Sequence, residues 1–167
     1  MLRKNTSRKA KVTGGTFAIV ASRYNAEFVD AMVRATRTEL LRAGAKVQVV
    51  RVPGAYEIPV VAAKLARSSH APRHRSLSAI ICLGVILRGE TTHAAHIGEA
   101  VSRSLMDIQV QTGVPVIHEV LLLENREQAR VRCLDKKHNR GTEAAQTALA
   151  MARVMRNLRA DDDDIPF

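Results

Sequence analysis

Two threonines and a histidine follow the most apolar run of the chain, at the point where a helix is predicted to begin. Residues 79–86 form this run, and Thr91, Thr92 and His93 come after a short turn. Free backbone N–H groups at a helix N-terminus, with two hydroxyls beside them, make an anion site. An imidazole on the first turn titrates near neutrality and can move protons for a bound substrate. On this loop alone, an ordinary helix cap at Thr91 and a solvated His93 stand as an equal alternative.

Polar and aromatic residues also follow the other three predicted strands. Residues 22–25 place an aromatic ring beside an amide, and residues 52–59 place a carboxylate at a helix start. Residues 128–132 and 139–141 supply arginines after the last strand. Ligands of open parallel sheets bind beyond the carboxyl ends of the strands. These four loops are therefore the predicted binding region.

The elements that must position these loops alternate along the chain. Apolar and β-branched runs at 16–21, 46–52, 79–86 and 114–123 predict four strands. Helices are predicted between Asn25 and Gly44, over 57–67, around Ile97, Val101, Leu105 and Ile108 before Gly113, over 126–131, and around Ala145, Leu149, Ala152 and Met155. This alternation predicts an α/β fold, a three-layer α/β/α sandwich with a four-stranded parallel sheet.

Length and composition fit a single domain. The chain has 167 residues, 46% of them hydrophobic but only 3% aromatic, so the core is expected to consist mainly of aliphatic side chains. Such a core suits helices packed on a buried parallel sheet. The domain is placed at 14–159, with a basic N-terminal segment at 1–13 and an acidic tail at 160–167, and disorder is expected for residues 1–13 and for the four aspartates at 161–164.

The charge of the chain favours anionic partners. Lys and Arg number 26 against 16 Asp and Glu, which gives a formal net charge of +10. Nucleic acid and a phosphorylated small molecule are the two candidates. With two Tyr, three Phe and no Trp, no basic run is interleaved with the stacking aromatics that single-strand binders use. We therefore expect a small-molecule ligand and no nucleic acid.

The cysteines and histidines suggest neither a disulfide framework nor a metal site. Cys82 and Cys133 are too few and too far apart for either, and we expect free thiols in a reducing compartment. His93 and His96 lie three apart, but the spacing supplies no further zinc ligands. The basic first eleven residues have no apolar stretch behind them, so a secretory signal is not expected. We therefore predict a cytoplasmic protein with no membrane partner.

Four segments resemble motifs of the lumazine synthase family, in the same order. They are Pro53-Gly54-Ala55-Tyr56-Glu57-Ile58-Pro59, the Gly84 to His93 stretch with Arg88-Gly89, Gln128-Ala129 with Arg132, and Asn139-Arg140-Gly141. The resemblance covers about residues 16–157 and implies a flavodoxin-like fold. It also implies condensation of 5-amino-6-(D-ribitylamino)uracil with 3,4-dihydroxy-2-butanone 4-phosphate to 6,7-dimethyl-8-ribityllumazine, a transferase step of riboflavin biosynthesis that releases phosphate and water. No cofactor and no metal is implied.

The resemblance further implies a role for each matching position. Tyr24 stacks on the pyrimidine, Asn25 and Glu57 hydrogen-bond the ribityl chain, and His93 shuttles protons during imine formation and phosphate elimination. The other implied contacts to the pyrimidine and ribityl groups are Ala55, Tyr56, Val85, Ile86, Leu87 and His118. The implied phosphate-binding residues are Glu90, Thr91, Thr92, Arg132 and Arg140.

Three positions depart from the family pattern. His118 stands where the family has an aromatic ring that a neighbouring subunit places over the substrate, and it adds a titratable group. Ala95 stands where an acidic residue is common, which removes a partner for His93. Arg140 replaces a lysine, which keeps the charge and changes its reach.

Two other functions and several assemblies are left open. A lumazine-synthase-like riboflavin synthase would need no butanone phosphate site, and Arg132 with Thr91-Thr92-His93 argues against it. A non-catalytic flavin-binding or shell-forming protein on the same fold is the second alternative. The resemblance implies a homo-oligomer with sites between subunits. A pentamer is expected, and a 60-subunit shell or a pentamer dimer is a larger possibility.

Overall fold

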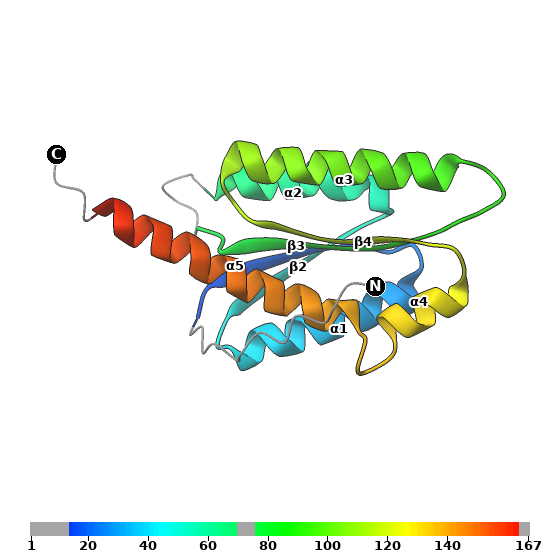
Figure 1. The fold of residues 1–167 in the computed structure, drawn as a ribbon, viewed down its shortest axis with the longest axis horizontal. Coiled ribbons are helices and arrows are strands. Elements are labelled where there is room, and N and C mark those ends of the chain that lie inside the picture. The colour runs from blue at the N-terminus through cyan, green and yellow to red at the C-terminus, as the bar shows by residue number, and fades with distance from the viewer. Residues whose placement is uncertain (1–13, 70–75, 164–167) are drawn as a thin grey trace.

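Four parallel strands form the centre of the molecule (Figure 1). The structure is a computed structural model that describes residues 14–69 and 76–163. The strands are β1 (Thr16–Ser22), β2 (Lys46–Val52), β3 (Ala79–Leu87) and β4 (Val116–Leu123), in the order β2-β1-β3-β4. All three pairings are parallel, so the carboxyl ends of the strands lie at one edge of the sheet.

Helices cover both faces of the sheet. Figure 1 shows α2 and α3 on one face and α1, α4 and α5 on the other. Their bounds are α1 (Ala26–Arg42), α2 (Ile58–Ser68), α3 (His93–Thr112), α4 (Arg126–Cys133) and α5 (Arg140–Asp163), with a short 3₁₀ turn η1 (Ala55–Glu57) before α2. The three-layer α/β/α, flavodoxin-like prediction is confirmed.

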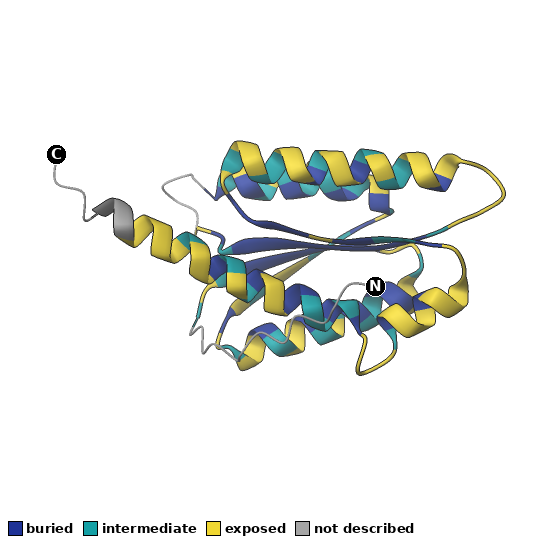
Figure 2. Cartoon of the chain, in the orientation of Figure 1, coloured by how far each residue is buried: buried dark blue, intermediate teal, exposed yellow. Residues whose placement is uncertain are grey.

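Each strand supplies apolar residues to two separate cores. On β1, Phe17 and Ile19 pack toward α1 and α5, whereas Ala18 and Val20 pack toward α2. Eight of the nine residues of β3 are buried, which explains why this strand is the most apolar run of the chain. Figure 2 shows the resulting band of buried residues along the sheet, with exposed residues on the outer sides of the helices.

Several predicted boundaries shift for local reasons. β4 begins at Val116 instead of residue 114, because Pro115 has no N–H for the ladder, although its carbonyl accepts from the Ile80 N–H at 2.8 Å. α2 begins at Ile58, one residue later than expected, because η1 occupies residues 55–57. Gly113 ends α3 in the left-handed region (φ 65°), as predicted.

The expected disorder of the acidic tail is wrong for its first residues. α5 continues through Asp163, four residues past the predicted domain end at 159, because no breaker interrupts its helix-forming sequence. The expected disordered segment at 1–13 and the last four residues lie outside the part of the chain that the structure describes.

Candidate active site

Three loops are hydrogen-bonded together at the carboxyl edge of the sheet. The N–H groups of Arg23 and Tyr24 donate to the carbonyls of Val52 and Pro53, at 2.8 and 3.0 Å, which ties the β1–α1 loop to the β2–η1 loop. The Asn25 side-chain amide donates to the Val85 carbonyl at 2.7 Å, which ties the same loop to β3. The loops predicted to bind the pyrimidine are thus held in one place by the chain itself.

Asn25 fulfils a structural role that the sequence does not reveal. It occupies the predicted N-cap position of α1, but its backbone is left-handed (φ 55°) and its side chain makes no capping bond. Asparagine tolerates this conformation better than most residues. The side chain instead crosses to Val85, so one of its two amide N–H donors is used within the chain.

Two exposed tyrosines and a carboxylate border the tied loops. Tyr24 and Tyr56 are 73% and 63% exposed, so each presents ring surface that a ligand can cover. One carboxylate oxygen of Glu57 accepts from the Gly54 N–H at 2.8 Å, which fixes the carboxylate beside the turn. The second oxygen of Glu57 has no partner among the described residues, so it can accept from a sugar hydroxyl.

The apolar residues predicted to line the site are buried or half-buried. Ala55 and Ile86 belong to the core beneath α2 and α3, whereas Val85 packs toward α1 and α5. Leu87 is half-buried at the end of β3. Because these side chains are largely buried, a ligand at the carboxyl edge can contact mainly backbone atoms and the side-chain carbons at the end of the strand.

The β3–α3 loop leaves its backbone donors open. Thr91, Thr92 and His93 are all exposed, and Thr92 is the N-cap residue of α3 without a side-chain capping bond. The Thr91 hydroxyl accepts from the His93 N–H at a long 3.4 Å. The unpaired N–H groups and the two hydroxyls are thus accessible, and anion binding by this loop stays a prediction. Because α3 also packs on η1, this loop belongs to the same edge as Tyr56 and Glu57.

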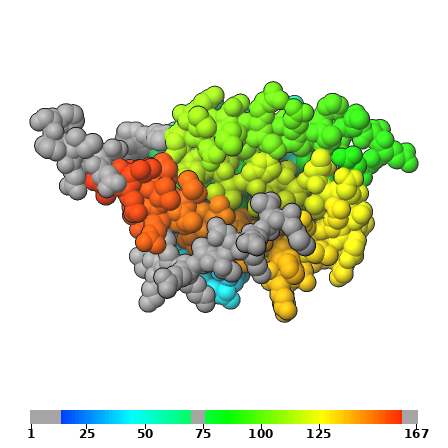
Figure 3. All heavy atoms as spheres, viewed as in Figure 1, coloured from blue at the N-terminus to red at the C-terminus, as the bar shows by residue number. Residues whose placement is uncertain are grey.

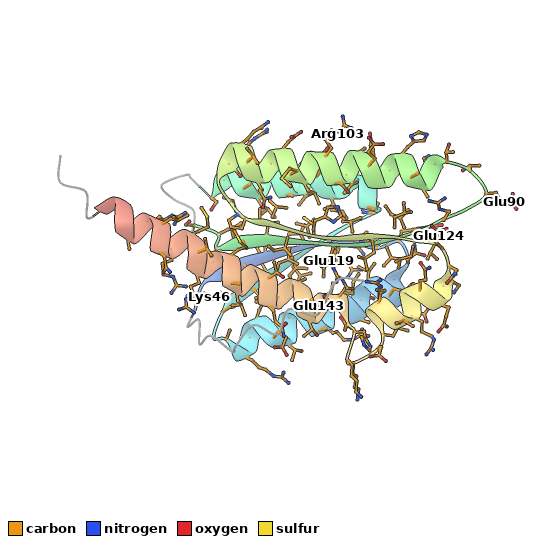
Figure 4. The ribbon with its side chains drawn as sticks, viewed as in Figure 1. Lys46, Glu90, Arg103, Glu119, Glu124 and Glu143 are labelled. Carbon is orange, nitrogen blue, oxygen red and sulfur yellow. The ribbon has the colours of Figure 1, made fainter. Side chains whose placement is uncertain are left out.

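Glu90 does not join that loop's polar groups. Figure 4 shows it at the tip of the loop, pointing away from the body of the molecule. The adjacent Arg88 pairs with Glu124 at 3.1 Å, which ties the start of the loop to the end of β4. A carboxylate in this place contributes no attraction for phosphate.

His118 lies well back from this edge. It pairs in register with Cys82 and lies five positions before Leu123, about 16 Å along the strand at ~3.3 Å per residue. Its Nδ1 accepts from the Val120 N–H at 3.2 Å, so the neutral ring carries its proton on Nε2, which lies 2.7 Å from the Ser102 hydroxyl. Partial burial beneath α3 lowers the pKa of His118 below its ordinary value. The ring is therefore held neutral with both nitrogens occupied, and its remaining contact surface is the ring face.

Two arginines and two carboxylates cluster on the other side of β4. Arg140 donates from Nε and Nη2 to both oxygens of Glu119, at 3.0 and 2.9 Å, and from Nη1 to Glu143 at 2.6 Å. Burial raises the pKa of Glu119, and Arg140 offsets only part of that rise. Arg132 on α4 is exposed, near enough to act on the Glu119 carboxylate, and forms no ion pair among the described residues. Figure 4 places Glu119 beneath the middle of the sheet, far along the strands from Glu90.

Other residues of the resembling motifs serve the fold. Gln128 accepts from the Glu124 N–H at 3.0 Å and closes the β4–α4 turn. Asn139 accepts from the Gly141 N–H at 2.9 Å and donates to the Cys133 carbonyl, which fixes the start of α5. Gly141 lies directly against the Met32 backbone of α1. These contacts place Arg132 and Arg140 on the same side of β4.

The predicted site residues thus form two groups in one chain. One group lies at the carboxyl edge and consists of Tyr24, Tyr56, Glu57 and the Thr91–His93 loop. The other group flanks the edge strand β4 and consists of His118, Arg132 and Arg140. In Figure 3 the β4 segment, coloured yellow-green, is visible between α3 and α5. One chain does not bring the two groups together.

Sequence reasoning missed Glu119, Glu143 and Ser102. The signal for Glu119 was an acidic residue inside the apolar run of β4, and the other two lie on helix faces with no distinctive local pattern. The described residues contain no group of three potential metal ligands, and none of their helices combines the length and apolar character needed to cross a bilayer.

These features define an open-sheet α/β protein with an uncapped helix start and exposed aromatics at the carboxyl edge. The 6,7-dimethyl-8-ribityllumazine synthase family matches residues 14–156. The chain belongs to this family.

Similar proteins agree with that membership. A 6,7-dimethyl-8-ribityllumazine synthase of Xanthomonas euvesicatoria pv. vesicatoria is 40% identical over 146 residues, covering 86% of this chain and 91% of that protein. One of Xanthomonas oryzae pv. oryzae is 42% identical over 142 residues, covering 83% and 88%. One of Stenotrophomonas maltophilia is 40% identical over 146 residues, covering 85% and 90%. The predicted family is confirmed.

Proposed function

We propose that the protein condenses 5-amino-6-(D-ribitylamino)uracil with 3,4-dihydroxy-2-butanone 4-phosphate, forming 6,7-dimethyl-8-ribityllumazine and releasing phosphate and water. The observation that carries this proposal is the open anion-binding start of α3 beside exposed aromatics, in a chain of this family. A phosphate bound by the first-turn N–H groups would lie beside His93, within reach of the proton transfers that imine formation and elimination require.

Each group of residues is assigned one part of the substrates. Tyr24 and the neutral face of His118 receive the pyrimidine, and the free oxygen of Glu57 receives the ribityl chain. Thr91 and Thr92 bind the phosphate together with Arg132. Asn25 supports the pyrimidine loops from within the chain.

We further propose that complete sites form between copies of the chain in a homo-oligomer, for which a pentamer is the expected form. The separation of about 16 Å between His118 and the carboxyl edge supports this proposal. At that distance, His118 and the carboxyl-edge residues of the same chain cannot contact the same part of one ligand. We also propose a cytoplasmic location, supported by two cysteines that are both buried and unpaired.

The first experiment incubates purified protein with both substrates and follows phosphate release and lumazine formation together. Turnover of both products is expected, with about a 10²-fold lower maximal rate in His93→Ala. A protein that instead converts lumazine to riboflavin, or binds flavin without turnover, would refute the proposed reaction.

Subunit mixing tests the shared site. His93→Ala and Arg132→Ala proteins, each strongly impaired alone when the butanone phosphate is well below saturation, are unfolded, mixed in equal amounts and refolded. Random assembly should give about one site in four with an intact pair of halves, and activity should return to that level. Mixtures whose activity does not rise above that of the single variants would contradict shared sites. Light scattering in low salt and in about molar salt, where the Debye screening length shortens to ~3 Å, provides a second test. An active monomer in either condition would also contradict shared sites.

A further inference from the structure

Glu119 is a buried charge that needs a reason. It is 6% exposed and is the one acidic or basic residue in the buried class across the described ranges 14–69 and 76–163. Burying a carboxylate costs free energy unless a partner compensates its charge. A protein with a well-packed apolar residue in place of a buried ion pair is often no less stable. A purely structural edge strand therefore gains little from a carboxylate at this position.

Its partner Arg140 is held on two sides. Glu119 takes the Nε and Nη2 edge of the guanidinium in a two-bond contact, and Glu143 takes a hydrogen of Nη1. Three of the five guanidinium donors are thus used within the chain. Asn139 and Gly141, on either side of Arg140, fix the start of α5 and leave the arginine little freedom to turn away.

Arg132 is the contrasting cation of the same cluster. It lies on the exposed side of α4 and pairs with no carboxylate in the described part of the chain. Glu119 and Glu143 both pair with Arg140, and neither pairs with Arg132. A phosphate that approaches the cluster therefore meets one guanidinium without a carboxylate partner instead of two.

We propose that Glu119 is a positioning residue that holds Arg140 away from the substrate phosphate, so that Arg132 alone supplies the mobile charge-assisted contact. This rests on the proposed function, in which the phosphate is both a binding handle and the leaving group. Two free guanidiniums would bind the substrate more tightly and would also retain the released phosphate. Glu119 thereby limits retention of inorganic phosphate after elimination.

The test uses Glu119→Gln, which keeps the size of the side chain and removes its charge. One additional charge-assisted contact strengthens phosphate binding by about tenfold. The inhibition constant of inorganic phosphate against the butanone phosphate should fall by that factor, and the KM of the butanone phosphate should fall with it. The KM of the pyrimidine should not change. If Glu119 only stabilised the fold, Glu119→Gln would lower the denaturation midpoint and would not change the KM of the butanone phosphate relative to that of the pyrimidine.

Two further variants isolate the mechanism. Glu119→Gln with Arg140→Gln removes both charges, so its phosphate inhibition should return toward the wild-type value. Glu143→Gln removes the more exposed carboxylate and should strengthen phosphate inhibition by a smaller factor, about twofold to threefold. If Glu119→Gln does not fold, the inhibition constant of inorganic phosphate for Glu143→Gln tests the proposal instead.

The outcomes separate the two proposals. A wild-type protein that forms no lumazine refutes the proposed function, whereas an active wild type with unchanged phosphate inhibition in Glu119→Gln refutes the role of Glu119. If Glu119→Gln fails to fold, unchanged inhibition in Glu143→Gln refutes it equally. Tighter phosphate inhibition that persists in the double variant also overturns the proposal, because the effect would then not act through Arg140.

Discussion

Gly141 offers a direct test of how α5 is placed against α1. A Cβ atom at this position would lie 2.2 Å from the Met32 carbonyl oxygen and 2.7 Å from its Cα. Both contacts are with backbone, which cannot rotate away as a side chain can. Gly141→Ala therefore requires α5 to move off α1, which loosens the fully buried alanines Ala144, Ala145 and Ala148.

The magnitude follows from the balance of two effects. Overpacking costs about 1–3 kcal/mol, and a backbone obstacle belongs at the upper end of that range. Alanine recovers up to about 1 kcal/mol of helix propensity. A net loss of about 2 kcal/mol is expected, which lowers Tm by about 4–8 °C for a chain of this size.

Gly98 provides the matched control. It is also helical, but a Cβ there would lie 3.5 Å from a Leu122 methyl group, an ordinary contact. Gly98→Ala should therefore be neutral or more stable than wild type. Thermal unfolding at one fixed protein concentration compares the two variants. A Gly141→Ala protein as stable as Gly98→Ala would refute the close-approach argument.

Three further predictions concern the site and the thiols. Arg132→Ala should raise the KM of the butanone phosphate by about tenfold to a hundredfold, since a charge-assisted hydrogen bond contributes ~1.5–3 kcal/mol, and unchanged steady-state constants would exclude it from the site. Burial lowers the pKa of His118, so its neutral form is favoured in the folded protein, and stability and pyrimidine or riboflavin binding should weaken as pH falls below the ordinary value of ~6.5. His118→Phe should flatten that dependence in titrations between about pH 5.5 and 8, and identical curves would exclude ring contact. Burial raises the pKa of Cys133 to about 11 and also raises that of Cys82, so both thiols should resist alkylation at pH 8 until the protein unfolds, as mass spectrometry would show.

The carboxyl-edge part of the site could be predicted because its position depends on strand pattern alone. Apolar runs mark the strands, and parallel pairing places every following loop at one edge. Tyr24, Glu57 and the Thr91–His93 loop needed no further information to be placed together. Their detailed contacts were not predictable, as the long-range bond from Asn25 to Val85 shows.

The second part depends on contacts between distant segments. Glu119 meets Arg140 across 21 positions, and Thr36 meets Gly141 across 105. No local period or spacing encodes such pairs, because they arise when α5 packs across the sheet. The resemblance could therefore point to Arg140 as a phosphate-binding candidate, but the sequence could not show that two carboxylates hold its side chain.

The geometry of β4 explains how one strand can serve both ends of a ligand. Consecutive strand residues point to opposite faces, so His118 turns toward α3 while Glu119 turns toward α5 and brings Arg140 to that side. β4 is an edge strand, and under the proposed function a ligand lying across its outer side would meet the ring of His118 on one flank and Arg132 on the other. The carboxyl-edge loops of another copy, laid across β4, would complete this arrangement, and this is the contact that the subunit-mixing experiment detects.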